Sequence, residues 1–260
     1  MPLKELFKGF KSLLSLLTTI PVGRESIEYA TKHFYLVPII GLIEGSIVSL
    51  SLYLLYIIGL NIIIISAMYP LIHLLITGGI HLDGYADYSD VLGSHRCCEE
   101  AFKILKDSRR GTFGIISITL NILISSTSIH LLLQGYLHSI EEFLLRIISI
   151  YIMSVEAMYI TAFFGKIEPY NGLGKGFVLN AKLPINIYRN IFLFLAIYLV
   201  LSIISYKNIL TLITILVFSL FTSIVIAIDA NKRLGFVNGD VIGFTFEIVK
   251  LITMVLITCI

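Results

Sequence analysis

The segment from Asn61 to Asp90 reads NIIIISAMYPLIHLLITGGIHLDGYADYSD. Its first twenty residues, up to Ile80, include no Asp, Glu, Lys or Arg, and about 20 such residues are what a helix needs to cross a bilayer. Its last residues bring Asp83, Asp87 and Asp90 into one short stretch. The segment therefore predicts a transmembrane helix whose end carries a cluster of carboxylates.

The rest of the chain has the same apolar character. Its 260 residues are 57% hydrophobic and 14% charged, with a mean hydropathy of +0.94, whereas soluble domains average about 45–50% and about 25%. This composition excludes a water-soluble domain and intrinsic disorder. A formal net charge of +2 gives no basic excess for binding nucleic acid. The three cysteines have no spacing typical of a disulfide framework or a zinc site.

Long apolar segments predict an all-α, polytopic integral membrane protein that forms a single domain over residues 1–260. We expect seven transmembrane helices, at about Tyr35 to Ile58, Asn61 to Ile80, Thr112 to Leu133, Phe143 to Gly165, Tyr188 to Ser205, Ile209 to Ile228 and Val241 to Ile260. Before them, Lys4, Lys8 and Lys11 alternate with leucine and phenylalanine at the spacing of an amphipathic helix. We expect this N-terminal helix to lie in the membrane interface.

The basic residues predict the orientation, because short loops rich in Lys and Arg stay in the cytoplasm. Of the 19 Lys and Arg residues, 16 fall in the N-terminal segment and the second, fourth and sixth loops, whereas Lys207 alone falls on the other side. The pattern predicts a protein of the cell membrane with its N-terminus in the cytoplasm and its C-terminus outside.

The aspartates after the second apolar segment predict a metal site. Asp83, Asp87 and Asp90 are spaced so that a helix places them on one face, where like charges repel one another unless a cation binds. Oxygen ligands without cysteine suit Mg²⁺ held together with a substrate phosphate. The alternative is a solvated acidic end of a helix.

The segment Lys106 to Gly114, KDSRRGTFG, predicts a phosphate site at the start of the third apolar segment. Lys106, Arg109 and Arg110 supply cations, and the backbone N–H of Gly111 would lie at a helix N-terminus. Asp107 is a fourth carboxylate or a residue that orients a guanidinium. Alternatively, the basic residues only keep this loop in the cytoplasm.

A third cluster, Asp240 and Glu247, opens the last apolar segment. The two acids are seven residues apart and so share a helix face, and ionisable groups at this depth of a membrane are usually functional. The alternative for Asp240 is a simple helix cap. Less specific are Lys175, in the glycine-rich stretch 171–177, His81, as a ligand or proton-transfer group, and the intramembrane acids Glu44 and Glu156, which line a pathway or pair with Arg146.

These motifs together resemble the cobalamin synthase family of adenosylcobinamide-GDP ribazoletransferases. The likeness extends over nearly the whole chain and rests on LTTIPV (17–22), PIIGLIEG (38–45), GGIHLDGYADYSD (78–90), KDSRRGTFG (106–114), GLGKGF (172–177) and NGDVIGFTFE (238–247). The chain departs from the family pattern where Leu17 and Thr19 replace a phenylalanine and an arginine, and where Val91 replaces a glycine.

The resemblance implies a Mg²⁺-dependent transferase with its active site facing the cytoplasm. It would transfer adenosylcobinamide phosphate from adenosylcobinamide-GDP to α-ribazole or α-ribazole 5′-phosphate, releasing GMP. Its partners would be these small molecules and membrane lipid, not nucleic acid; whether it forms a homo-oligomer is left open.

The resemblance also implies roles for the three clusters. Asp83, Asp87 and Asp90 would hold the metal, and Asp240 and Glu247 would complete the metal site or accept the proton of the attacking alcohol. Lys106, Arg109 and Arg110 would bind the GDP portion, with Arg109 contributing more because it belongs to the DSR-x-GT run. Asp107, Gly111 and Lys175 complete the set of expected phosphate-site residues.

Two other classes of membrane protein use similar carboxylates. A CDP-alcohol phosphotransferase requires the pattern D-x-x-D-G-x-x-A-R, but Asp87 follows Asp83 and Gly84 where Ala-Arg would fall. A secondary transporter places its acids near the bilayer midplane and often contains repeats, whereas the densest acids here lie at the cytoplasmic ends of spans and no repeat is visible.

Overall fold

The computed structural model describes residues 3–23, 26–107, 109–205 and 209–259. These residues form helices and contain no β-strand, only one isolated bridge between Ile167 and Val237. The helices are α1 (Leu3–Leu17), α2 (Ile27–Lys32), the 3-10 helix η1 (Phe34–Leu36), α3 (Val37–Ile57), α4 (Ile62–Thr77), α5 (Ile80–Ser94), α6 (Cys98–Leu105), α7 (Thr112–Tyr136), α8 (Ile140–Phe164), α9 (Leu173–Ala181), α10 (Pro184–Ile204), α11 (Ile209–Arg233) and α12 (Gly239–Cys259). The predicted all-α fold is confirmed.

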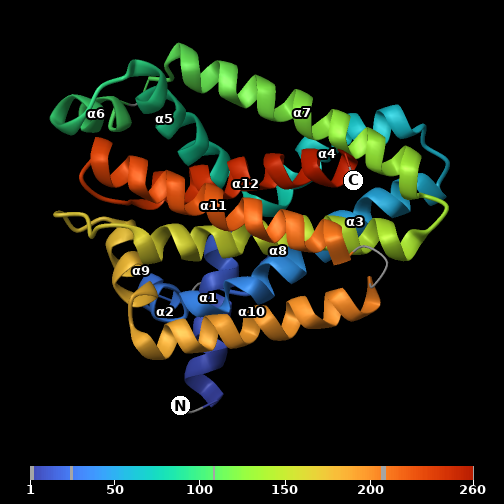
Figure 1. The fold of residues 1–260 in the computed structure, drawn as a ribbon, viewed down its shortest axis with the longest axis horizontal. Helices are drawn as coiled ribbons and strands as arrows, with labels where there is room; N and C mark the ends of the chain where they lie inside the picture. The colour runs from blue at the N-terminus through green and yellow to red at the C-terminus, as the bar shows by residue number, and fades with distance from the viewer. Residues whose placement is uncertain (1–2, 24–25, 108, 206–208, 260) are drawn as a thin grey trace.

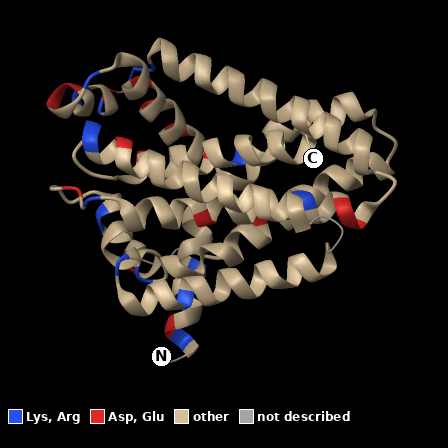
Figure 2. Cartoon of the chain, viewed as in Figure 1, with Lys and Arg blue, Asp and Glu red and all other residues tan. Residues whose placement is uncertain are grey.

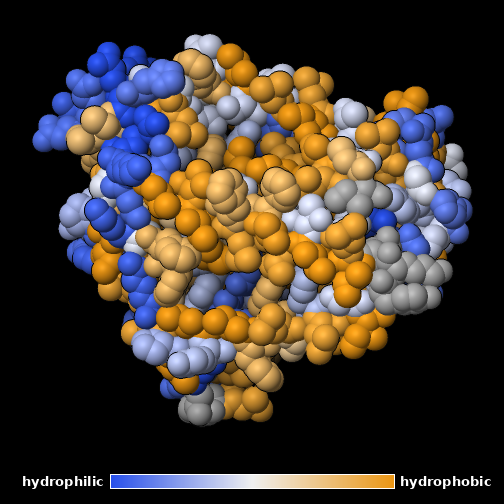
Figure 3. Space-filling view, viewed as in Figure 1, coloured by the Kyte–Doolittle hydropathy of each residue, from blue (hydrophilic) through white to orange (hydrophobic). Residues whose placement is uncertain are grey.

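Six of the predicted spans correspond to single long helices. In the described part of the chain, the helices with the length and apolar composition to cross a membrane are η1 with α3, and α7, α8, α10, α11 and α12. Their ends differ from the predicted ends by five residues or fewer. Apolar side chains cover the flank of this bundle in the space-filling view (Figure 3). Such a surface fits a multi-pass membrane protein.

The second predicted span is broken and not a continuous helix to Ile80. Helices α4 and α5 meet at an angle of 104°. Between them Gly78 and Gly79 have φ of 66° and 76°, a left-handed conformation that residues with a Cβ adopt only at a cost. The glycine pair therefore ends α4 after 16 residues, and the membrane is crossed a seventh time only if α4 and α5 together form one span.

The path of the chain supports that reading. In Figure 1, α3, α7, α10 and α12 run in one direction along the long axis, and α8 and α11 return. Helix α3 ends and α7 begins at opposite ends of the bundle, so α4 and α5 together return the chain from one end of the bundle to the other. Figure 2 shows that most Lys and Arg residues gather at the end of the molecule where α5 and α6 lie.

Helices α5 and α12 approach each other closely because glycines face the opposite backbone. A Cβ on Gly84 would lie 2.7 Å from the carbonyl oxygen of Asp240, and a Cβ on Gly243 would lie 3.2 Å from the Cα of His81. A larger residue at position 84 has no room. This contact places the first turn of α12 beside the first turns of α5, where two of the predicted clusters meet.

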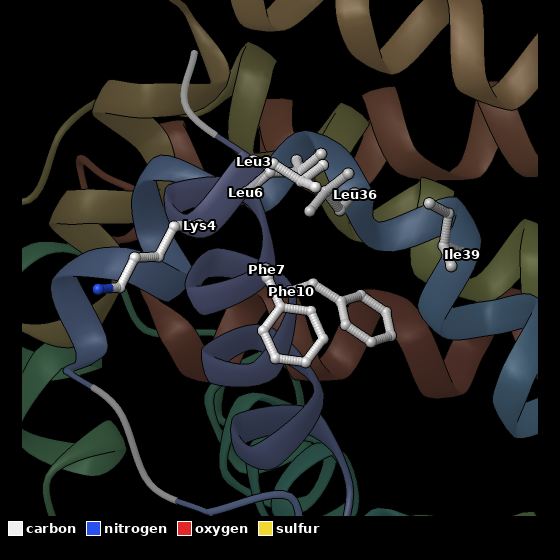
Figure 4. Close-up of a pocket in the computed structure, with 7 residues that line it drawn as sticks. All are labelled: Leu3, Lys4, Leu6, Phe7, Phe10, Leu36 and Ile39. Atoms are coloured by element: carbon white, nitrogen blue, oxygen red, sulfur yellow. The ribbon is translucent and has the colours of Figure 1, made fainter.

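Helix α1 runs across the other helices and extends beyond α10 at its N-terminal end (Figure 1). Its second half is buried through Leu13, Leu14 and Leu17, whereas Leu3 and Phe7 are exposed. Together with Leu36 and Ile39, the exposed face of α1 lines a groove of about 720 Å³, from which Lys4 points away (Figure 4).

Short helices fill the loops at the charged end. The glycine-rich stretch 171–177 is typical of a flexible loop, but its residues from Leu173 onward form the first turns of α9. Gly174 makes this possible, because a Cβ there would lie 2.6 Å from the Cα of Asn238. Helix α9 is therefore packed against the segment that leads into α12.

Candidate active site

Asp83 and Asp87 lie one turn apart on α5 and bind the same guanidinium. Arg110 donates through Nη2 to Asp83 Oδ1 and through Nη1 to Asp87 Oδ1. Residues four apart on a helix share a face, which is why one planar guanidinium reaches both carboxylates. The Asp83 side chain is 59% exposed and that of Arg110 39%. The pair thus already binds a cation at a position open to solvent.

Asp90 makes a different set of contacts, although it shares the α5 face. Its Oδ2 accepts a hydrogen bond from the N–H of Gly111 at 2.8 Å, and its Oδ1 accepts one from the N–H of Gly114 at 2.8 Å. A carboxylate at the start of a helix satisfies free N–H groups and interacts favourably with the helix dipole. Asp90 thus caps α7, and a Cβ on Gly111 would collide with it at 2.3 Å.

Two of the expected site residues, Gly111 and Asp90, bind each other in this structure, and the roles predicted for them in phosphate and metal binding stay predictions. The N–H of Gly111, expected to bind a phosphate, is occupied by Asp90, and Asp90 does not join Asp83 and Asp87 around one cation. Within the described residues, no group of three or more His, Cys, Asp or Glu side chains is arranged to hold a metal ion. Asp83 and Asp87 are the two carboxylates of this cluster that converge on one cation, the guanidinium of Arg110.

The neighbouring pair Asp107 and Arg109 lies at the surface and is self-contained. Asp107 accepts hydrogen bonds from Arg109 Nε at 3.0 Å, from Nη2 at 2.8 Å and from its backbone N–H at 3.0 Å. These bonds lower the pKa of Asp107 to about 2. Asp107 thus orients a guanidinium, one of the two roles considered. The Arg109 side chain is 87% exposed, so the geometry favours Arg110 and not Arg109 as the arginine of the site.

Asp240 joins the aspartates of α5 from the first turn of α12. Its neighbour Asn238 caps that helix, since Asn238 Oδ1 accepts from the N–H of Val241 at 3.2 Å. The amide of Asn238 also donates to Asp240 Oδ2 at 2.8 Å. Asp240 is thus held by Asn238 and is not the cap. It lies close enough to Asp83, Lys106 and Arg110 to interact with their charges.

A cavity of about 250 Å³ opens between these helices, and both Asp83 and Asp240 line it. Lys106 lies close enough to Asp240 for their charges to interact, and its Nζ is 5.8 Å from the ring centre of Tyr170. The cavity, Arg110 and the three aspartates Asp83, Asp87 and Asp240 define what we call the candidate active site.

Glu247 is not part of the candidate active site. It is fully buried, and its carboxylate accepts hydrogen bonds from Lys250, from Asn121 Nδ2 at 2.9 Å and interacts with His73 Nε2 at 3.0 Å. Seven residues of helix also separate it from Asp240 by about 10 Å along the axis. Asp240 and Glu247 can still lie on the same face of α12, as predicted, but their carboxylates are too far apart to act at one site.

Lys175 and Glu156 form structural contacts within the described chain, whereas the buried carboxylate of Glu44 has no hydrogen-bond partner there. The backbone N–H of Lys175 donates to the buried Glu168 at 2.6 Å, and its Nζ donates to Asn171 at 3.1 Å. Glu156 accepts a hydrogen bond from Asn190 at 3.1 Å, and the guanidinium of Arg146 stacks over the ring of Tyr136 at 3.8 Å.

Sequence reasoning missed Asn238 and Glu168. Each stands just before a helix that carries site residues, and each binds backbone N–H groups at its start. The sequence does indicate a helix cap at Asn238, because Asn238 precedes Gly239 and Asp240 where an apolar segment begins. The sequence gives less indication of the role of Glu168, since the glycine-rich start of α9 is not typical of a helix.

Comparison with known proteins identifies relatives over the whole chain. A family model described as cobalamin-5-phosphate synthase matches residues 9–258. A protein of Clostridium kluyveri named adenosylcobinamide-GDP ribazoletransferase is 29% identical over 259 residues, which cover 98% of both chains. Proteins with the same name are 31% identical in Clostridium botulinum over 264 residues, covering 98% of this chain and 100% of the relative, and 30% identical in Clostridium perfringens over 252 residues, covering 95% and 96%. No solved structure gives a significant match.

Proposed function

The chain belongs to the cobalamin-5-phosphate synthase family, and we propose that it catalyses the reaction for which its relatives are named, adenosylcobinamide-GDP ribazole transfer. Its substrates are then adenosylcobinamide-GDP and α-ribazole or α-ribazole 5′-phosphate, and its products adenosylcobalamin or its 5′-phosphate and GMP. The observation that carries the assignment of the site is the pair Asp83 and Asp87 bound to Arg110, beside a cavity that Asp240 lines.

The reaction exchanges a phosphoanhydride bond for a phosphoester bond. A ribose hydroxyl oxygen attacks the phosphorus that bears the cobinamide, the bond from that phosphorus to the bridging oxygen breaks, and GMP leaves with that oxygen. The hydroxyl proton must be accepted by a base. Catalysis of this kind relies on positioning and on neutralising negative charge, which are tasks for cations and correctly placed carboxylates.

Asp83 and Asp87 fit a magnesium ion. They converge on one cation, the guanidinium of Arg110, and Mg²⁺ in proteins is usually bound by one or two carboxylates together with substrate phosphates. When bound, Mg²⁺ would neutralise charge on the phosphoryl oxygens. Arg110, released from the aspartates, is placed to bind the diphosphate through its two-pronged donor face.

Asp240 is the carboxylate best placed to accept the hydroxyl proton. It lines the cavity and is held through one oxygen by Asn238, whereas Asp83 and Asp87 are bound to Arg110 and Asp90 caps α7. A base must lie within hydrogen-bonding reach of the proton that it removes. The cavity beside Asp240 supplies a place for the alcohol.

The orientation is also a proposal. The basic residues gather at the end of the molecule that carries the candidate active site (Figure 2), and this end faces the cytoplasm if the positive-inside rule applies. The C-terminal end of α1 reaches the candidate active site through Leu16 and Leu17, and the exposed face of its N-terminal half carries the apolar groove of Figure 4. Such a helix lies in the interface of the cell membrane.

The experiment is GMP release by purified protein in lipid vesicles. With adenosylcobinamide-GDP and α-ribazole as substrates, Asp83→Asn should lower turnover by on the order of 100-fold at ordinary Mg²⁺, because one metal ligand is lost. The control is Glu99→Gln, an exposed acid on α6, which should keep full activity. Release of CMP from CDP-diacylglycerol in place of GMP would contradict the proposal and favour a phosphatidyltransferase.

A further inference from the structure

The groove along α1 adjoins a second hollow beside α10. The groove of Figure 4 and this hollow, which has a volume of about 430 Å³, share the lining residues Leu3, Leu6, Leu36 and Ile39. The second hollow is also lined by Tyr35, Arg189, Phe192 and Leu193. We refer to the two together as the α1 groove. Its walls come from α1, from η1 with α3, and from α10, so it is a trough between three elements and not the convex surface of one helix.

The lining of the α1 groove is apolar and open. Leu3 is 81% exposed, Phe7 62% and Phe192 72%, and contiguous apolar surface of this kind marks a place where another apolar group binds. Helix α10 has the length and composition to cross the membrane, and α1 has the apolar and basic faces of an interfacial helix. With α1 in the membrane interface, the groove opens toward the acyl chains of the bilayer.

Arg189 gives the α1 groove a cation at its edge. Its guanidinium lies 5.3 Å from the ring centre of Tyr35, and Tyr35 is the only partner that this guanidinium has among the described residues. Lys4 also lines the groove but points away from it (Figure 4). Arg189 is half-buried and follows the start of α10 by about 8 Å along the axis. A guanidinium without a carboxylate, at the depth of lipid headgroups, is suited to bind a phosphate.

We propose that the α1 groove binds one anionic phospholipid of the bilayer, with its phosphate at Arg189 and an acyl chain between α1, α3 and α10. The inference goes beyond the proposed reaction and does not depend on it. Charge favours an anionic headgroup over a zwitterionic one, because α1 carries three lysines and a single glutamate and basic residues near a membrane surface attract anionic lipid. The lipid would join α1 to α10, and α1 reaches the candidate active site through Leu16 and Leu17.

The chain contains no tryptophan, so Phe192→Trp places a single fluorescent reporter in the α1 groove. The full chain is reconstituted in phosphatidylcholine vesicles in which a minor share of the lipid is phosphatidylglycerol or phosphatidylcholine with brominated acyl chains, because bromine quenches tryptophan on contact. Quenching should show an apparent affinity about fivefold or more higher for phosphatidylglycerol.

The matched reporter is Ile228→Trp, at a residue of α11 that is 45% exposed and lies close in sequence to Lys232 and Arg233 but does not line the α1 groove. The two brominated lipids should quench it nearly equally, since it contacts only the surrounding bilayer. The same preference at both reporters would overturn the proposal, because it would indicate a general attraction of anionic lipid to the basic end of the protein.

A second substitution in the Phe192→Trp protein tests the role of the cation. Arg189→Gln should remove the preference for phosphatidylglycerol, whereas Lys103→Gln, which removes an exposed charge from α6, should keep it. The preference of the reporter protein that retains Arg189 tests the site even if Arg189→Gln does not fold. The proposal is overturned if Arg189→Gln keeps the preference, or if the groove reporter is shielded from both brominated lipids, which would indicate a second copy of the chain in the groove.

Discussion

Arg110 differs from its neighbour Arg109 in what its guanidinium binds. Arg110 reaches across to the two aspartates of α5, whereas Arg109 turns back onto Asp107 at the surface. If Arg110 binds the diphosphate, Lys cannot reproduce its planar fork. Arg110→Lys should therefore weaken the apparent affinity for adenosylcobinamide-GDP by about one to two decades, the equivalent of a charge-assisted bond of roughly 1.5–3 kcal/mol.

Arg109→Lys is the matched control for this prediction, because it changes the same residue type one position away. It should leave the affinity within about twofold, since exposed ion pairs contribute little. Titration of the GDP-activated substrate against both proteins measures the difference. A larger loss in Arg109→Lys than in Arg110→Lys would contradict the geometry and return the role to the arginine that the motif favours.

The individual site residues show how far sequence reasoning reached. The three aspartates, the basic segment and Asp240 could be found from residue type and helical spacing alone. Which of two adjacent arginines faces the aspartates depends on the turn before α7, and periodicity does not describe turns. Asp90 could not be distinguished from Asp83 for the same reason, because its partners, the N–H groups of Gly111 and Gly114, come from a distant segment.

At the scale of elements, the contact between α5 and α12 holds the site together. Gly84 lies against the backbone of Asp240, so Gly84→Ala must move one helix, because the Cβ would lie 2.7 Å from that carbonyl oxygen. We expect Gly84→Ala to lower kcat/KM by about tenfold or more and to destabilise the protein by roughly 1–3 kcal/mol, as overpacked sites do.

The chain offers a matched control in Gly135, a helical glycine of α7 whose Cβ would have no neighbour within 4 Å. Gly135→Ala should keep full activity and be neutral or slightly stabilising, by up to about 1 kcal/mol. Assays of GMP release and thermal unfolding on both variants check the prediction. Equal effects of the two substitutions would mean that close approach of α5 and α12 is not required.

The long helices could be predicted because a stretch of uncharged residues is nearly sufficient to define one. The glycine pair itself indicates a break at Gly78 and Gly79, but hydropathy averaged over a window of about 20 residues does not show it. Helix α9 could not be predicted, because three glycines in seven residues indicate a loop. One of these glycines, Gly174, is required for a different reason, since it packs directly against the backbone of Asn238.

In the whole molecule, a buried polar network joins helices that carry the site. Glu247 on α12 binds Lys250, Asn121 of α7 and His73 of α4, and His73 in turn bonds the hydroxyl of Tyr151 on α8 at 2.8 Å. Removal of one partner of a buried ion pair leaves the other uncompensated and costs about 3–5 kcal/mol. Glu247→Gln should therefore destabilise strongly, because Lys250 is 1% exposed.

The double variant Glu247→Gln with Lys250→Met removes both charges and should recover most of that loss. Thermal unfolding of the three proteins in the same vesicles is the measurement. If Glu247 acted only in chemistry, Glu247→Gln would abolish GMP release without lowering the unfolding temperature, and the double variant would be no more stable than the single one.

The number of membrane crossings decides on which sides the two ends of the chain lie. If α4 and α5 form one broken span, the molecule crosses seven times and its two ends lie on opposite sides, whereas a re-entrant pair gives six crossings and places both ends on one side. In both cases α7, α8, α10, α11 and α12 cross between the loop before α6 and the end of α12, so these two places lie on opposite sides, and the one that faces outward shows the orientation. The native cysteines report on both places, because Cys97 and Cys98 are exposed before and at the start of α6 and Cys259 is exposed at the end of α12. No new cysteine has to be introduced.

Two variants use these cysteines, one that keeps Cys97 alone and one that keeps Cys259 alone. In intact cells, a membrane-impermeant maleimide should label the Cys259 protein and leave the Cys97 protein unlabelled, and permeabilised cells should label both. This result follows from the positive-inside rule applied to 16 basic residues on one side. Labelling of the Cys97 protein and protection of the Cys259 protein in intact cells would reverse the predicted sides of the loop before α6 and the end of α12, and labelling or protection of both would contradict the five crossings between them.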